Sequence, residues 1–336
     1  MVPNLSPPSP VSPTVDFEAN GKQHGVLKLP WSRDDSAWGA IHIPICVVKN
    51  GQGPTALFFG GNDGDEYEGP IALYELARTL RTDEISGRVI IVPALNYPAF
   101  RAAKRTSPID GGNMNRIFPG KPDGSITEKI ADFVERGLLP RADLVLDIHS
   151  GGRSLDFVPF AAAHFLEDKA QEARSMNAAE AFGAPYTVRM REIDAVGMLD
   201  TAAENLGKTF VTTELAGGGT ATPGSAGVAK RGVRNLLKHA GILDGPPDPS
   251  KTQWLTMEEG GTFAESPTDG LIDYVVSLGD EVRAGASVAH ITPHGRTGAE
   301  PVTVTAPGDG LLIGRHFPGL VQTGDCVAVV GSLDKE

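Results

Sequence analysis

Short apolar runs alternate with helical patterns from about residue 40 to residue 240, and this alternation restricts the chain to few folds. Strands are expected at 41–48, 55–61, 88–96, 142–150 and 209–219, and helices at 69–80, 126–137, 167–182 and 223–240. Strands that alternate with helices build a sheet that is covered by helices on both faces. We therefore predict an α/β domain over 21–245 with a mixed sheet flanked by helices.

The pattern changes after residue 245. Residues 241–253 have the Pro- and Gly-rich composition of a linker, and 255–332 contain strands separated by glycine turns without a helical pattern. We predict a small all-β domain over 255–332, because its GDEVRAGASVAHI and TAPGDGLL segments resemble the biotinyl/lipoyl barrel sandwich. No lysine lies between Lys251 and Lys335, so the carrier lysine of that family is absent. A structural or lid role is therefore expected.

The composition excludes several classes of partner. The net charge is −12, and nucleic acids or anionic membranes as partners require basic surfaces. No apolar stretch approaches the roughly 18 residues of a membrane span. Residues 1–20 contain five prolines and lack the apolar core of a secretory signal, so we expect a flexible Pro-rich arm. Two cysteines, Cys46 and Cys326, do not make a disulfide framework, which favours a cytoplasmic protein.

Four carboxylates stand close together in the glycine-rich segment 60–70. Asp63, Asp65, Glu66 and Glu68 lie between a predicted strand and a predicted helix. Acids at the start of a helix can simply stabilise its dipole and cap its N–H groups. Four acids within six residues, however, repel one another unless a cation or arginines lie nearby. The segment is therefore either a capping loop or part of a cation site.

A histidine ends another apolar strand, in the segment DIHSGG at 147–152. Asp147 precedes His149 by two residues and lies on the same face of the strand. Such a histidine often only makes hydrogen bonds, but the following Ser-Gly-Gly and the acidic loop with Glu66 make it a candidate ligand. One imidazole with one or two carboxylates leaves room for water, as in a catalytic zinc site.

Two further segments carry polar residues. The loop 104–120 contains Arg105, Asn115 and Arg116, which are either ordinary surface side chains or a clamp for a carboxylate. Glu214 follows an apolar strand, where burial raises the pKa of a carboxyl group. A carboxylate of this kind can act as a general base towards a metal-bound water, or it can brace the glycines that follow it.

Four segments in this order resemble the succinylglutamate desuccinylase/aspartoacylase family, a branch of the zinc carboxypeptidase superfamily. They are GGNDGDEYEGP, NMNRIFPG, DIHSGG and TTELAGGG, and the resemblance extends over roughly residues 40–331. It implies a zinc-carboxypeptidase-like fold with a β tail and one Zn2+ per chain. It also implies that Glu66 and His149 are metal ligands and that Glu214 is the general base. In the same family an Asn-Arg pair, here Asn115-Arg116, grips the substrate carboxylate, and an arginine matched by Arg105 polarises the scissile carbonyl.

Position 63 departs from the family's pattern, which has a histidine as the first zinc ligand where this chain has Asp63. A carboxylate also ligates zinc, but two carboxylates with one histidine make the metal a weaker Lewis acid. Three interpretations stay open: an active site with a changed metal preference, a site that binds metal poorly, or a variant form of an active parent. We expect Asp63 to reach any metal that is bound.

The resemblance implies a zinc-dependent amidohydrolase that removes an acyl group, foremost acetyl, from a small N-acyl amino acid. The net charge of −12 would repel a dianionic substrate. N2-acetyl-L-2,4-diaminobutanoate, a substrate of the family's ectoine-degrading branch, carries an amine as well as a carboxylate, so its net charge is closer to zero and it is favoured. Asp65, Glu68 and Asp194 are candidates for contact with its amine.

Two rival functions remain. One is a catalytically impaired metal- or amino-acid-binding member of the family, because of Asp63. The other is a carboxypeptidase, against which we note that a β tail near the strand ends would narrow the access for peptides. A homo-oligomer is compatible with the sequence, which does not fix its symmetry.

Overall fold

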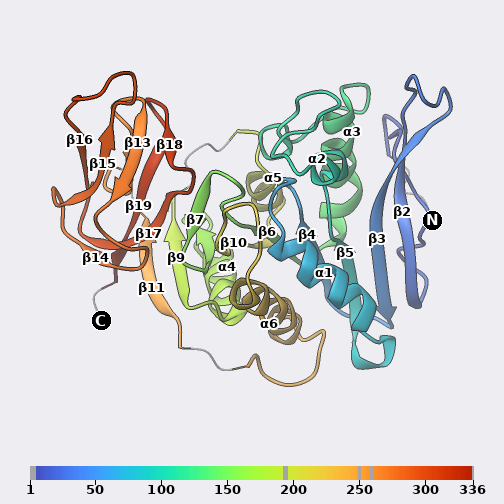
Figure 1. Cartoon of the computed structure of the whole chain (residues 1–336). Coiled ribbons are helices and arrows are strands. Elements are labelled where there is room, and N and C mark those ends of the chain that lie inside the picture. The colour runs from blue at the N-terminus through green and yellow to red at the C-terminus, as the bar shows by residue number, and fades with distance from the viewer. Residues whose placement is uncertain (1–4, 192–195, 249–250, 258–259, 335–336) are drawn as a thin grey trace.

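The computed structural model describes residues 5–191, 196–248, 251–257 and 260–334, and it has two parts joined through one continuous sheet (Figure 1). The first is a mixed sheet with helices on both faces. From Gln253 onward, the described residues contain strands and loops but no helix, and we call them the C-terminal part. The predicted fold class is therefore confirmed.

Parallel strands occupy the centre of the main sheet. The pairs β5–β4, β4–β6 and β6–β10 are parallel, and all residues of β4 and β6 are buried, as expected for strands covered on both faces. In spatial order the strands are β1 (Ser12–Pro13), β2 (Gly21–Pro30), β3 (Ala40–Asn50), β5 (Gly87–Val92), β4 (Thr55–Gly60), β6 (Leu144–His149), β10 (Thr209–Glu214), β8 (Phe160–His164), β9 (Tyr186–Met190), β11 (Gln253–Met257), β19 (Cys326–Leu333), β17 (Gly310–His316) and β14 (Glu281–Val282).

Two apolar cores lie on opposite faces of this sheet, because successive residues of a strand point to opposite sides. Phe58 packs with residues of α1, α4 and α6, whereas Leu57 and Phe59 pack with residues of α3 and α5. The helices are α1 (Glu68–Thr79), α2 (Tyr97–Ala102), α3 (Ile126–Phe133), α4 (Lys169–Phe182), α5 (Leu199–Asn205) and α6 (Pro223–His239). Among the described helices, none has the length and apolar character to cross a membrane.

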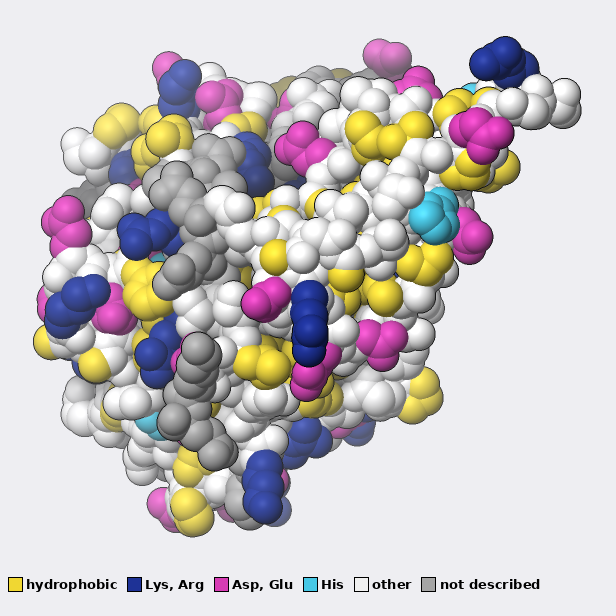
Figure 2. Space-filling model, turned by 90° about the vertical axis from the view of Figure 1, so that its left-hand side faces the viewer, with side chains coloured by type: hydrophobic (Ala, Val, Ile, Leu, Met, Phe, Trp, Pro, Cys, Tyr) yellow, Lys and Arg dark blue, Asp and Glu magenta, His cyan; other side chains and the backbone are white. Residues whose placement is uncertain are grey.

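The C-terminal part is a sandwich of strands that extends the main sheet. Its second sheet has the order β16 (Val302–Thr305), β15 (Ser287–Thr292), β13 (Gly270–Tyr274) and β18 (Leu320–Val321). Ile291 of this sheet packs with Leu312 and Val330 of β17 and β19. Charged side chains of both signs are interspersed with apolar ones on its outer face (Figure 2).

Two short strands lie off the main path of this sheet, and one of them joins the two parts. β12 (Phe263–Glu265) pairs with β19, and β7 (Leu155–Phe157) of the α/β part pairs with β17. Since β7 lies a few residues after His149, the C-terminal part is attached close to the end of β6.

The N-terminal segment differs from the flexible arm that we expected over 1–20. Within its described portion, Ser12 and Pro13 pair with β2, and Val11, Val15 and Phe17 are buried in the core. The prolines exclude a helix here, but an edge strand tolerates proline. The alternation of Val11, Val15 and Phe17 with polar residues places their side chains against the sheet.

Candidate active site

The candidate site forms where three adjacent parallel strands end. β4, β6 and β10 are neighbours, and Glu214 at the end of β10 is paired in register with His149 at the end of β6. Gly60 at the end of β4 pairs with Ile148. In open α/β sheets, ligands bind beyond the carboxyl ends of such strands. The loop that follows β4 therefore lies at the same edge of the sheet as His149 and Glu214.

The loop after β4 turns two carboxylates towards the interior, and Asp63 and Glu66 are only 1% and 3% exposed. Gly61 has a φ of 60°, which glycine adopts without strain. A Cβ on Gly64 would lie 2.2 Å from the carbonyl carbon of Ala99 in α2. Glycine at these two positions thus lets the acidic loop turn sharply and pack against α2.

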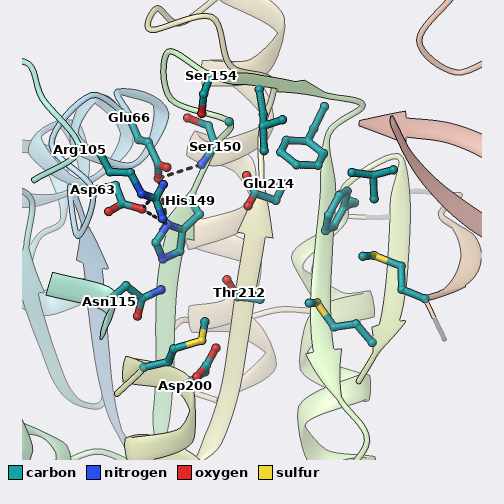
Figure 3. A pocket seen from close by; sticks show the side chains of 18 of the residues that line it. Asp63, Glu66, Arg105, Asn115, His149, Ser150, Ser154, Asp200, Thr212 and Glu214 are labelled. Atoms are coloured by element: carbon teal, nitrogen blue, oxygen red, sulfur yellow. Dashed lines mark hydrogen bonds and ion pairs between the residues drawn. The ribbon is translucent and has the colours of Figure 1, made fainter. Parts of the chain in front are cut away.

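Asp63, Glu66 and His149 bring one ligand atom each to within 4.8 Å of one another. His149 Nδ1 is 2.9 Å from Glu66 Oε2 and 3.7 Å from Asp63 Oδ2 (Figure 3). On the other side of the ring, Nε2 is 2.9 Å from Asp147 Oδ2, which also accepts a 2.7 Å hydrogen bond from Asn62. In metal sites, a carboxylate behind the imidazole fixes the orientation of the ring. Nδ1 is therefore the candidate ligand atom.

This donor set fits a divalent cation. All three residues are buried, and Asp63 Oδ1 has no hydrogen-bond partner within the described part of the chain. A buried carboxylate oxygen without a partner is costly unless a cation binds it or the group is protonated. One imidazole with two carboxylates is a ligand set that zinc accepts, and oxygen-rich sets also suit Mn2+ and Mg2+.

Burial raises the pKa values of the acids in this cluster. Burial raises the pKa of Glu66 to about 7. Burial also raises the pKa of Glu214 well above its ordinary value, and the negative charge of Glu66 raises it further. Burial alone would lower the pKa of His149, but the carboxylates of Asp147 and Glu66 outweigh it and raise that pKa. Buried acids so close together cannot all ionise without a cation nearby.

Arg105 supplies one positive charge beside the cluster. Its Nη1 is 2.9 Å from Asp63 Oδ2, and its side chain is about half exposed. Burial would lower the pKa of Arg105, but the charges of Asp63 and Glu66 outweigh this effect and raise it. A guanidinium in this position can stabilise a negative oxygen that develops during a reaction.

Glu214 enters from β10, and Figure 3 shows its carboxylate directed into the cavity, across from His149. Its Oε2 is buried and has no hydrogen-bond partner among the residues that the structure describes. A carboxyl group with a raised pKa and an unpaired oxygen can accept a proton and return it.

Asn115 and Arg116 lie in a short helical turn, Met114–Arg116, that borders the same cavity. The Asn115 Oδ1 accepts a 3.0 Å hydrogen bond from the backbone N–H of Leu199, at the start of α5. Arg116 Nη1 donates a 2.6 Å hydrogen bond to the Asn115 carbonyl. These bonds fix the turn, with Asn115 buried and Arg116 exposed at the cavity.

All seven predicted site residues line one cavity of about 220 Å³. The C-terminal part completes the wall with Met257, Phe263 and Val329. The C-terminal part therefore narrows the access to the site, as expected from the sequence, and the cavity is of a size for a small molecule.

Four polar residues of this wall have no signal in the sequence, namely Ser154, His164, Asp200 and Thr212. His164 has no metal-ligand spacing, and its Nδ1 lies 2.9 Å from Glu204 Oε1. Asp200 is in the first turn of α5, where an acid is equally explained by the helix dipole. No local signal distinguishes these residues from ordinary ones.

The acids considered for the substrate amine are not among the described residues of the wall. Asp65 Oδ2 accepts a 2.9 Å hydrogen bond from the N–H of Arg153, and Glu68 Oε1 accepts one of 2.9 Å from Ser225. Asp194 lies outside the described residues.

Comparisons with known proteins show the family to which this chain belongs. The sequence model of the succinylglutamate desuccinylase/aspartoacylase catalytic domain matches residues 52–240. N-alpha-acetyl-L-2,4-diaminobutyric acid deacetylase of Halomonas elongata is 52% identical over 98% of this chain and 97% of its own length.

Solved structures show the same similarity. The product-bound ectoine utilization protein EutE (DoeB) of Ruegeria pomeroyi is 57% identical, with a TM-score of 0.95 over 97% of this chain and 99% of that chain. A succinylglutamate desuccinylase/aspartoacylase of Rhodobacter sphaeroides is 39% identical, with a TM-score of 0.92 over 97% of this chain and 100% of that chain. The chain therefore belongs to the succinylglutamate desuccinylase/aspartoacylase family.

Proposed function

We propose that this chain hydrolyses the acetyl amide of N2-acetyl-L-2,4-diaminobutanoate to acetate and 2,4-diaminobutanoate. The observation that carries the proposal is the cavity, in which a metal-ligand cluster, an unpaired buried carboxyl oxygen and an Asn-Arg turn surround about 220 Å³. The relative from Halomonas elongata supports the choice of acyl group and amino acid. The neighbour from Ruegeria pomeroyi, an ectoine utilization protein, supports a place in ectoine degradation.

We assign the metal site to Asp63, Glu66 and His149 Nδ1, with Zn2+ as the cation. Bound there, zinc would polarise the scissile carbonyl and lower the pKa of a water molecule. The free thiols of Cys46 and Cys326 fit the cytoplasmic location expected from the sequence.

The chain's own residues perform the other tasks. Asn115 and Arg116 bind the α-carboxylate and so fix the orientation of the substrate. Arg105 donates hydrogen bonds to the carbonyl oxygen as negative charge develops on it. Glu214 accepts a proton from the attacking water and returns it to the nitrogen as the C–N bond breaks.

One observation favours a second candidate, an impaired member of the family that binds a metal or an amino acid. Arg105 Nη1 lies 2.9 Å from Asp63 Oδ2, so a guanidinium and a metal ion compete for the same carboxylate. A histidine at position 63 would not attract Arg105 in this way.

The test measures zinc content and acetate release from N2-acetyl-2,4-diaminobutanoate for this chain and for Asp63→His. Asp35→His is the matched control, since the Asp35 side chain is 91% exposed. About one zinc per chain with acetate release supports the proposal, with Asp63 as a working ligand. Zinc binding and turnover only in Asp63→His support the second candidate, and no turnover in either protein overturns the proposed reaction.

A further inference from the structure

The cavity wall carries one more acid, away from the metal-ligand cluster. Asp200 is only 6% exposed and lines the cavity from the first turn of α5. Figure 3 shows Asp200 and Thr212 on the other side of the His149 ring from Glu66 and Ser150. The remaining acids of the described wall, Asp63, Glu66 and Glu214, lie at the strand ends. The far end of the cavity therefore has a carboxylate of its own.

The position of Asp200 is fixed relative to the Asn-Arg turn. The N–H of Leu199, its neighbour in the chain, donates to Asn115 Oδ1 at 3.0 Å. The Oδ1 of Asp200 accepts hydrogen bonds from the backbone N–H of Thr201 and from the Thr201 hydroxyl, the latter at 3.2 Å. A group bound by Asn115 and Arg116 thus lies at a set distance from the Asp200 carboxylate.

The substituents of an N-acyl amino acid can be assigned to these positions. The acyl amide must reach the strand ends, and the α-carboxylate binds to Asn115 and Arg116. The side chain of the amino acid is then left to face the wall formed by Asp200, Thr212 and Met198. A buried carboxylate there attracts a cationic group by a charge-assisted hydrogen bond and repels an anionic one.

We propose that Asp200 binds the side-chain ammonium of the substrate and makes the site selective for N-acyl diamino acids over neutral or acidic ones. This inference rests on the proposed function for the orientation of the substrate. It names a residue that discriminates between substrates whose reacting amide is identical.

The test compares N2-acetyl-2,4-diaminobutanoate with N-acetylnorvaline, in which a methyl group replaces the ammonium. Asp200→Asn keeps the size of the side chain and the acceptor for Thr201. Because hydrogen bonds to charged groups are the stronger ones, we expect kcat/KM for the diamino substrate to fall about 10- to 100-fold, mainly through KM. For N-acetylnorvaline we expect a change of less than about threefold. Asp35→Asn, the exposed control, leaves both values unchanged.

A binding measurement separates this inference from the proposed reaction. By calorimetry, 2,4-diaminobutanoate should bind this chain about 10- to 100-fold more tightly than it binds Asp200→Asn, and norvaline should bind both proteins alike. If neither substrate releases acetate, the proposed reaction fails, and the calorimetric difference still tests Asp200. If the ratio of the affinities for 2,4-diaminobutanoate and norvaline is the same in this chain and in Asp200→Asn, the inference is overturned. If Asp200→Asn does not melt cooperatively, Asp200→Ser, which is also neutral, replaces it in both experiments. The same loss for the diamino ligand is then expected, with no change for norvaline.

Discussion

The α/β part and the C-terminal part contribute to one cavity in different ways. Every charged side chain of the described wall comes from the α/β part, whereas the C-terminal part supplies only Met257, Phe263 and Val329. The charged groups are fixed by strand register and by hydrogen bonds such as the one between Asp147 and His149. The apolar side chains do not need such exactly fixed positions, because they act by excluding water from the site.

The comparison separates chemistry from enclosure. Excluding water strengthens each electrostatic interaction inside a cavity. The α/β part therefore acts on the reaction through its charged groups, and the C-terminal part acts by keeping water away from them. A change at a strand end should abolish proton transfer or metal binding. A change in the C-terminal wall should instead alter which acyl groups fit, with a small effect on the chemical step.

The largest effect is expected for Glu214→Gln. An amide cannot take the proton of the attacking water, so kcat should fall about 10²- to 10⁴-fold, the usual contribution of a general base. Binding of 2,4-diaminobutanoate, measured by calorimetry, should change less than about threefold, because the shape of the cavity is kept. Glu75→Gln, on the exposed face of α1, is the control. Unchanged kcat in Glu214→Gln would exclude the general-base role.

The strand-end part of the site could be predicted because its signals are local. Apolar runs locate β4, β6 and β10. Because these strands are parallel neighbours, the acidic loop after β4 meets His149 at the end of β6 and Glu214 at the end of β10. The fold class follows from the same alternation of strands and helices.

The rest depends on contacts between distant segments. Asp200 becomes part of the wall only because α5 is tied to the turn at Asn115, 84 residues earlier in the chain. The pairing of β7 with β17 joins Phe157 to Gly314, and no local pattern specifies it. The burial of Val11 has no local signal either, because the five prolines of residues 1–20 indicate a flexible segment, whereas the packing of Val11 depends on tertiary contacts.

A smaller effect is expected for the dependence of metal affinity on pH. Burial raises the pKa of Glu66 in the metal-free protein to about 7, and a metal binds only the ionised carboxylate. Protons therefore compete with the metal as the pH falls below 7, and zinc affinity should drop about five- to tenfold per unit. Above pH 7 this group contributes at most about a twofold further rise in affinity, because it is half ionised at its pKa.

Competition with a chromophoric chelator at pH 6, 7 and 8 measures the effect, and calorimetry in buffers of different ionisation enthalpy counts the released protons. Zinc affinity that is equal at pH 6 and pH 7 would contradict the assignment of Glu66 as a ligand. Phe263→Ala should show the same pH dependence as the parent, because the C-terminal wall carries no charge.

The smallest effect is expected for Phe263→Ala, which tests the enclosing role of the C-terminal part. Phe263 is 43% exposed and lines the cavity from β12, so its removal widens the opening while the charged groups keep their positions. We expect kcat/KM for the acetyl substrate to fall only about two- to fivefold, since one apolar contact in a pocket changes discrimination modestly. The ratio of butyryl to acetyl turnover should rise by a similar factor. Leu271→Ala removes an apolar side chain of comparable exposure, 52%, from β13 outside the cavity, and it should leave this ratio unchanged. A loss of turnover as large as that of Glu214→Gln would show that the C-terminal part takes part in the chemistry and would end the distinction between the two parts.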